Sequence, residues 1–128
     1  MPTILMNLNH SIVMKMENAF EKMIQDENAF SFIARYQDKS IGYILGFVKT
    51  RPDSAFQYEK TVLHIDQIAV LQRYQKHGVG KSLMEEAYQL AKVKQVNEIQ
   101  LDFWAGNELA ERFFYRNGFN YFNHRMKK

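Results

Sequence analysis

The sequence has no cysteine and few residues that interrupt regular structure, with two prolines and six glycines among 128 residues. Without cysteine there is no disulfide, no thiolate metal ligand and no cysteine nucleophile, which fits a reducing compartment. Apolar runs long enough to span a membrane are missing, and so is the basic start of a secretory signal. We therefore expect a cytoplasmic protein that has no membrane partner.

A strong excess of one charge is also missing. The net charge of +3 is compatible with an anionic ligand but lies far below that of a nucleic-acid-binding protein, so no nucleic-acid partner is expected. Hydrophobic residues make up 46% of the chain and aromatic residues 14%, which excludes disorder and predicts an aromatic-rich core. A chain of this length supports one core, so residues 1–128 are expected to form a single domain.

The spacing of the apolar residues alternates between a helical period and a strand period along the chain. The helical period covers residues 11–26, 79–91 and 107–116, and the strand period covers residues 29–36, 41–50, 61–70, 98–103 and 119–125. This order predicts an α/β fold with a mixed sheet. An antiparallel meander is followed by one β-α-β crossover, with helices on both faces of the sheet.

The third expected strand changes phase in its middle. Leu63 and Ile65 are apolar at odd positions, whereas Ile68 and Val70 are apolar at even positions. Because successive side chains of a strand point to opposite faces, one extra residue is needed to keep all four on the same face. The pattern therefore predicts a β-bulge near Asp66, which would leave backbone groups free for a ligand.

The most informative stretch lies between this strand and the next helix. It consists of Gln75, Lys76, His77, Gly78, Val79, Gly80, Lys81 and Ser82. Its two glycines let the backbone turn tightly, so that amide groups at the helix N-terminus can point outward, and its lysines add positive charge. These properties predict a binding site for a pyrophosphate group.

Three phosphate-binding patterns compete for this stretch. The dinucleotide fingerprint G-x-G-x-x-G fails, because Leu83 stands where the third glycine is required. The Walker A pattern matches residues 80–82 but has Gln75 in place of its first glycine, and a P-loop nucleotide-binding protein stays open as an alternative. The third pattern, Q/R-x-x-G-x-G/A, matches in full from Gln75 to Gly80.

With this third pattern the sequence resembles the GNAT superfamily of acyl-CoA-dependent N-acyltransferases. A second block, one helix and one strand further on, resembles that family's second conserved region. Its matching residues are Asn107, Ala110, Phe114, Tyr115, Gly118 and Phe119. Both ends of the chain are shorter than is usual in the family, which predicts a less protected sheet edge and self-association as a homodimer.

The resemblance implies the GNAT fold and the transfer of an acetyl group from acetyl-CoA to a primary amine of a small molecule, peptide or protein. A non-catalytic acyl-CoA-binding module of the same fold is the alternative. The strands at residues 61–70 and 98–103 are expected to splay apart to admit the cofactor. The residues expected to contact it are Ile68, Ala69 and Val70 at the pantetheine arm, Gln75, Lys76, His77, Gly78, Val79, Gly80, Lys81 and Ser82 at the pyrophosphate, and Asn107 and Phe114 beside it.

The implied chemistry needs few protein groups. A neutral amine attacks the thioester directly, so neither a covalent enzyme intermediate nor a metal is expected. A backbone N–H group near Ile68 polarises the thioester carbonyl, and Tyr115 is the candidate acid for the departing thiolate. His64 and Asp66 are the candidate bases, because they lie on the strand that leads into the site.

Overall fold

The structure, a computed structural model, describes residues 27–55 and 58–128. In chain order its elements are β1 (Ala29–Tyr36), β2 (Lys39–Arg51), β3 (Lys60–Val70), the 3₁₀ helix η1 (Gln72–Tyr74), α2 (Val79–Val93), β4 (Ile99–Leu101) and α3 (Glu108–Arg116). The helix predicted over residues 11–26 lies outside the described residues.

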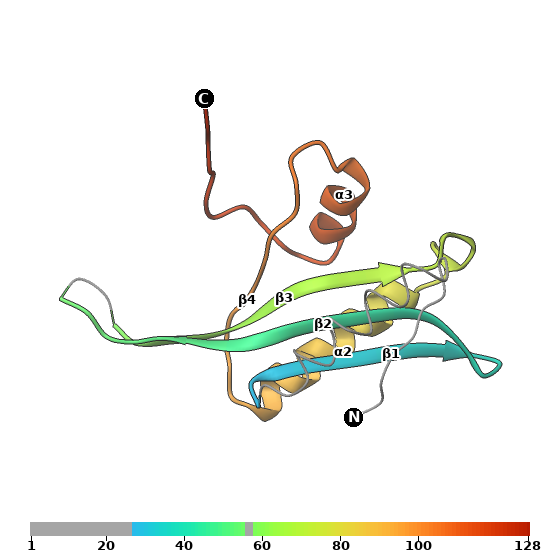
Figure 1. Cartoon of the computed structure of the whole chain (residues 1–128), viewed down its shortest axis with the longest axis horizontal. Helices are drawn as coiled ribbons and strands as arrows, with labels where there is room; N and C mark the ends of the chain where they lie inside the picture. Colours follow the sequence, from blue (N-terminus) through green and yellow to red (C-terminus); the bar gives the residue numbers. More distant parts are fainter. Residues whose placement is uncertain (1–26, 56–57) are drawn as a thin grey trace.

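The strands form one mixed sheet in the order β1-β2-β3-β4. β1, β2 and β3 pair antiparallel, and β4 pairs parallel with β3 after the crossover through α2, which confirms the predicted meander and crossover. Figure 1 shows α2 running along one face of the three long strands. No helix in the described part of the chain is long and apolar enough to cross a membrane.

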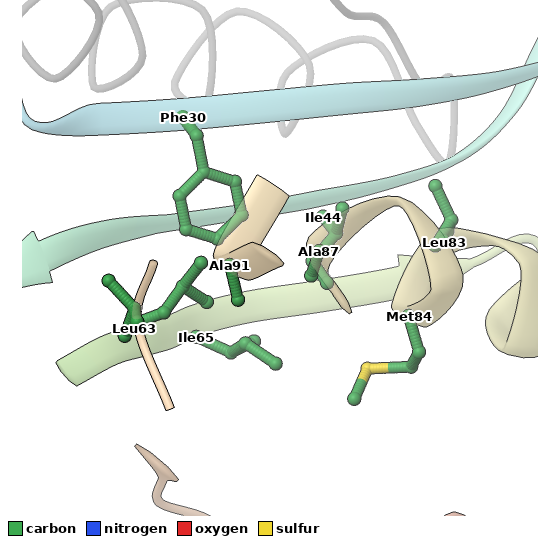
Figure 2. Close-up of a cluster of buried hydrophobic side chains, with 9 residues drawn as sticks. Phe30, Ile44, Leu63, Ile65, Leu83, Met84, Ala87 and Ala91 are labelled. Carbon is green, nitrogen blue, oxygen red and sulfur yellow. The ribbon is translucent and has the colours of Figure 1, made fainter. Parts of the chain in front are cut away.

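The main core lies between α2 and this face of the sheet. Its buried members are Phe30, Ile44, Leu63, Ile65, Leu83, Met84, Ala87, Ala91 and Val96, most of which are labelled in Figure 2. The buried residues of α2 are spaced by one, three and four positions, so they form a single stripe toward the sheet. Ile68 and Val70 pack against the same cluster, although their positions have the opposite parity to those of Leu63 and Ile65.

The predicted bulge in β3 is confirmed, and it explains how residues at odd and at even positions pack against the same core. Leu45 pairs with Gln67 and Gly46 pairs with Ile65, so Asp66 is the extra residue. The two strands approach so closely here that a Cβ atom added to Gly46 would lie 2.1 Å from the backbone oxygen of His64. The bulge therefore depends on the missing side chain at position 46.

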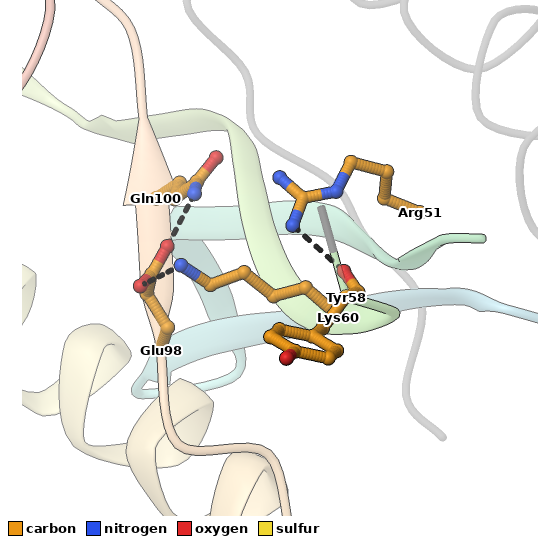
Figure 3. A network of polar contacts seen from close by, with 5 residues as sticks. All are labelled: Arg51, Tyr58, Lys60, Glu98 and Gln100. Atoms are coloured by element: carbon orange, nitrogen blue, oxygen red, sulfur yellow. Dashed lines mark hydrogen bonds and ion pairs between the residues drawn. The ribbon is translucent and has the colours of Figure 1, made fainter. Parts of the chain in front are cut away.

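One end of the β3–β4 pair is fastened by side chains. The Lys60 ammonium lies 2.7 Å from the Glu98 carboxylate, and the Gln100 amide donates a hydrogen bond to the same carboxylate (Figure 3). These two hydrogen bonds lower the pKa of Glu98 from its ordinary value, and the one from Lys60 has the larger effect. Nearby, the Arg51 guanidinium donates to the Tyr58 carbonyl at 2.9 Å.

Two predicted strands need correction. The strand predicted over residues 98–103 is limited to Ile99–Leu101, and residues 119–125 form no strand. A segment with alternating apolar residues becomes a strand only where a neighbouring strand pairs with its backbone. Only three residues of β4 pair with β3. The Tyr121 ring packs instead on the Tyr115 ring of α3, with 5.8 Å between the ring centroids.

The bulge gives a stability prediction. Gly46→Ala is expected to lower the free energy of unfolding by about 2–3 kcal/mol, because the new methyl group forces apart two paired backbones. Urea denaturation measures this change. Lys39→Ala, at an exposed position of the same strand, is the control and is expected to change stability by less than about 0.5 kcal/mol. Equal denaturation midpoints for the two variants would contradict the packing argument.

Candidate functional site

The candidate site begins where β3 and β4 separate. Their last pair is Ile65 with Leu101, and β3 continues for five more residues, to Val70, without a β4 partner among the described residues. The predicted splay of the two strands is therefore observed. It starts directly at the bulge, since Asp66 is the next residue of β3.

Backbone groups of β3 face this opening. The Leu71 N–H points toward β2, where it donates to the Ile41 carbonyl at 2.9 Å. Because alternate residues of a strand direct their backbone groups to alternate neighbours, those of Ile68 and Val70 point away from β2, toward the opening. The Val70 carbonyl accepts a hydrogen bond from the Gln75 side chain at 3.2 Å. This edge thus offers donors and acceptors to an extended ligand, and the predicted contacts with pantetheine stay predictions.

The loop before α2 has the conformation that a phosphate site requires. Gly78 is the N-cap residue with φ of 84°, in the left-handed region, and it provides no side chain to cap the helix. Lys76 also has a positive φ, of 66°. The Ser82 N–H donates to the Gly78 carbonyl, which is the first hydrogen bond of the helix, so the N–H groups of residues 79–81 have no acceptor within the helix. Together with the helix dipole, these groups favour an anion.

The two glycines of this loop are required for different physical reasons. A Cβ atom at Gly78 would meet nothing within 4 Å, whereas one at Gly80 would lie 2.9 Å from the Phe113 ring. Gly80 therefore lets α3 pack against the first turn of α2. Gly78 instead leaves the approach to the amide groups open.

Asn107 and Phe114 occupy well-defined places in α3. The Asn107 side-chain oxygen accepts a hydrogen bond from the Ala110 N–H at 3.1 Å, so Asn107 caps the helix. Phe114 is buried among the rings of Phe103, Phe113 and Phe119, with centroid distances of 5.3–5.8 Å. The structure thus explains both residues by capping and packing, and their predicted contacts with the cofactor stay predictions.

Tyr115 lies on a different side of α3 from Phe114 and is 51% exposed. Its ring meets the Tyr121 ring edge-on, and the Tyr121 hydroxyl donates to the Glu111 carboxylate one turn before Tyr115. This hydrogen bond to the carboxylate raises the pKa of Tyr121 to about 12. Glu111 and Tyr115 therefore share a face of α3, as their spacing predicts.

His64 and Asp66 flank the point where the strands separate, but only His64 has a carboxylate partner. Its Nε2 atom lies 3.3 Å from Oδ2 of Asp102, the first residue after β4. The His64 side chain is 17% exposed and that of Asp102 is 89% exposed. Asp66 is exposed on the bulge. Sequence analysis did not assign Asp102 to the acyl-transfer site; the available signal was a carboxylate inside the strand predicted over residues 98–103.

A separate hollow of about 450 Å³ lies at the other end of the β3–β4 pair. Its lining includes Lys60, Tyr88, Glu98 and Phe122. It shares no residue with the loop before α2 and contains neither His64 nor Asp102. We therefore do not assign it to the candidate site.

Solved structures of other proteins share this fold. The BH1408 protein from Bacillus halodurans, as a tetramutant, matches with a TM-score of 0.83 and 21% identity over 99% of this chain and 78% of that chain. Aminoglycoside N-acetyltransferase AAC(6')-Iy, in complex with CoA, matches with a TM-score of 0.77 and 19% identity over 93% and 88%. AAC(6')-IG from Acinetobacter haemolyticus matches with a TM-score of 0.72 and 17% identity over 89% and 82%.

The sequence as a whole gives the same result. The family described as Acetyltransferase (GNAT) matches residues 7–119, which include the bulged strand, the loop before α2 and all of α3. This match leaves the P-loop interpretation of the loop without support. The chain belongs to the GNAT acetyltransferase family.

Proposed function

We propose that the protein transfers the acetyl group of acetyl-CoA to a primary amine by direct attack. The observation that carries this proposal is the separation of β3 from β4 at a bulge, next to a helix N-terminus that no side chain caps. Two of the similar structures are aminoglycoside acetyltransferases by name, and one of them is in complex with CoA. We therefore propose a small-molecule amine as the acceptor.

The cofactor would lie along the open edge of β3. Backbone groups of Ile68 and Val70 would bond to the amides of the pantetheine arm, as a neighbouring strand would, with Ala69 between them. The amide groups from Gln75 through Ser82 would hold the pyrophosphate, assisted by the positive end of α2. Asn107 and Phe114 would line the other side, and no metal takes part in this arrangement.

The reaction itself would be a nucleophilic substitution at the thioester carbonyl. The nitrogen lone pair attacks the carbonyl carbon, an N–C bond forms, and the C–S bond breaks to release a thiolate. A backbone N–H group near Ile68 stabilises the oxyanion, and Tyr115 gives its proton to the thiolate. The proton lost by the amine goes to a carboxylate at the opening, where Asp66 and Asp102 lie beside His64.

The remaining expectations accompany this proposal. We propose one domain over residues 1–128, a symmetric homodimer and a cytoplasmic location. A non-catalytic acyl-CoA-binding module would bind the same cofactor, and release of free CoA thiol in the presence of amines distinguishes an enzyme from such a module.

The cofactor loop can be tested at its open glycine. Gly78→Val is expected to abolish measurable stabilisation by acetyl-CoA, because the side chain would fill the approach to the amide groups and disfavour the left-handed backbone. Thermal-shift titration with acetyl-CoA, CoA and ATP measures the effect. Neutralisation of Lys81 by Lys81→Met is expected to have a smaller, salt-sensitive effect.

The matched control for this variant is Gly118→Val. Gly118 also has a left-handed φ, of 87°, and open space around its Cα, but it lies beyond α3. Both variants introduce the same backbone strain, so only Gly78→Val should lose the response to acetyl-CoA. A similar response in the two variants would count decisively against the site.

Tyr115 can be tested as the acid. Tyr115→Phe keeps the ring and removes the hydroxyl, so binding of acetyl-CoA is expected to persist while turnover falls by about 100-fold. The loss is expected in kcat and kcat/KM together, as for an interaction made in the transition state. Tyr58→Phe, at a tyrosine that is 89% exposed on the β2–β3 loop, is the control. An unchanged kcat under conditions where chemistry limits the rate would assign Tyr115 to packing alone.

A further inference from the structure

Asp102 and His64 form a pair across the opening between two strands. The contact joins residues 38 positions apart in sequence, and Asp102 is the first residue after the paired strand β4. His64 pairs in register with Gln100, so Asp102 lies on the same sheet face as His64, two residues further along. That face is opposite the core, because the neighbouring Leu63 and Ile65 pack toward α2. The pair thus marks the mouth of the opening on the face away from α2.

Neither nitrogen of His64 is available to a substrate. Nε2 is engaged with Asp102, and Nδ1 is buried without a hydrogen-bond partner among the described residues. A buried N–H without an acceptor is costly, so the proton of the neutral ring is better placed on Nε2, where Asp102 accepts it. His64 therefore donates to Asp102 and presents no free lone pair at the opening.

Asp102, in contrast to His64, is accessible to a substrate. Its side chain is 89% exposed, and its ion pair with His64 is the only one it makes within the described part of the chain. That contact engages Oδ2, so the other carboxylate oxygen is left for solvent or a ligand. A carboxylate accepts hydrogen bonds only, and its natural ligand is a cationic donor such as an ammonium group.

We propose that Asp102 binds the ammonium group of the acceptor and that His64 is the positioning residue that holds the Asp102 carboxylate at the mouth of the opening. This inference rests on the proposed acetyl transfer and specifies its acceptor as a cationic amine. Asp66, the first unpaired residue of β3, adds a second exposed carboxylate beside the mouth. The ammonium is thereby held where transfer of one proton to the Asp66 carboxylate or to water yields the neutral amine nucleophile.

Steady-state kinetics with substituted variants tests the assignment. The assay follows release of CoA thiol from acetyl-CoA with an aminoglycoside, 1,4-diaminobutane and a lysine-containing peptide as probes. With the best probe, Asp102→Asn is expected to raise the KM for the amine about tenfold, the effect of one charge-assisted hydrogen bond, and to leave the KM for acetyl-CoA unchanged. Glu86→Gln, an exposed carboxylate of α2, is the matched control and is expected to change neither value.

Variants of His64 separate positioning from general stability. His64→Gln keeps an N–H donor at the reach of Nε2 and is expected to keep the wild-type KM for the amine. His64→Leu removes the donor and is expected to raise that KM to the level of Asp102→Asn. The double variant His64→Leu with Asp102→Asn is expected to show no further rise, because both changes remove one interaction. The melting temperature with acetyl-CoA verifies that each variant is folded.

The outcomes distinguish the inference from the function on which it rests. An active Asp102→Asn enzyme with an unchanged KM for the amine overturns the role of Asp102, whereas acetyl transfer stands. Equal KM values for His64→Gln and His64→Leu overturn the positioning role of His64. If acetyl-CoA stabilises the wild type but no probe releases CoA, the proposed transfer and the inference both fail.

Discussion

The close approach of two backbones at Gly46 and His64 is the constraint on which the rest of the structure depends. An ordinary side chain at position 46 would collide with the oxygen of His64, so the β2–β3 pair can form its bulge only around glycine. The bulge places Asp66 as an unpaired residue and advances β3 by one position. As a result, Ile68 and Val70 reach the same core as Leu63 and Ile65.

The bulge also divides β3 into two parts that differ in their strand pairing. Before it, β3 is a central strand, paired with β2 on one side and with β4 on the other. After it, β3 keeps β2 but has no β4 partner among the described residues, so one edge is left for a ligand. The side chains of β3 still bury themselves against α2, and the free edge is therefore held rigidly by the core rather than by a loop.

Sequence patterns predicted the features that local physics decides. The phase change in β3 predicted the bulge, and the residues from Gln75 to Gly80 predicted an open helix start. Features that depend on partners distant in sequence were not predictable in this way. The length of β4 depends on its register with β3, and the pairing of Asp102 with His64 follows from that register. In the same way, the glycine pattern did not reveal that Gly80 is needed beneath Phe113.

The ion pair between Lys60 and Glu98 acts at a distance from the opening. It fastens β3 to β4 at one end, and the two strands separate only beyond Ile65 and Leu101. The paired residues from Leu63 to Ile65 lie between this ion pair and the opening, and their pairing with β4 determines where the two strands begin to separate. The start of the opening thus depends on residues that no ligand in it would touch.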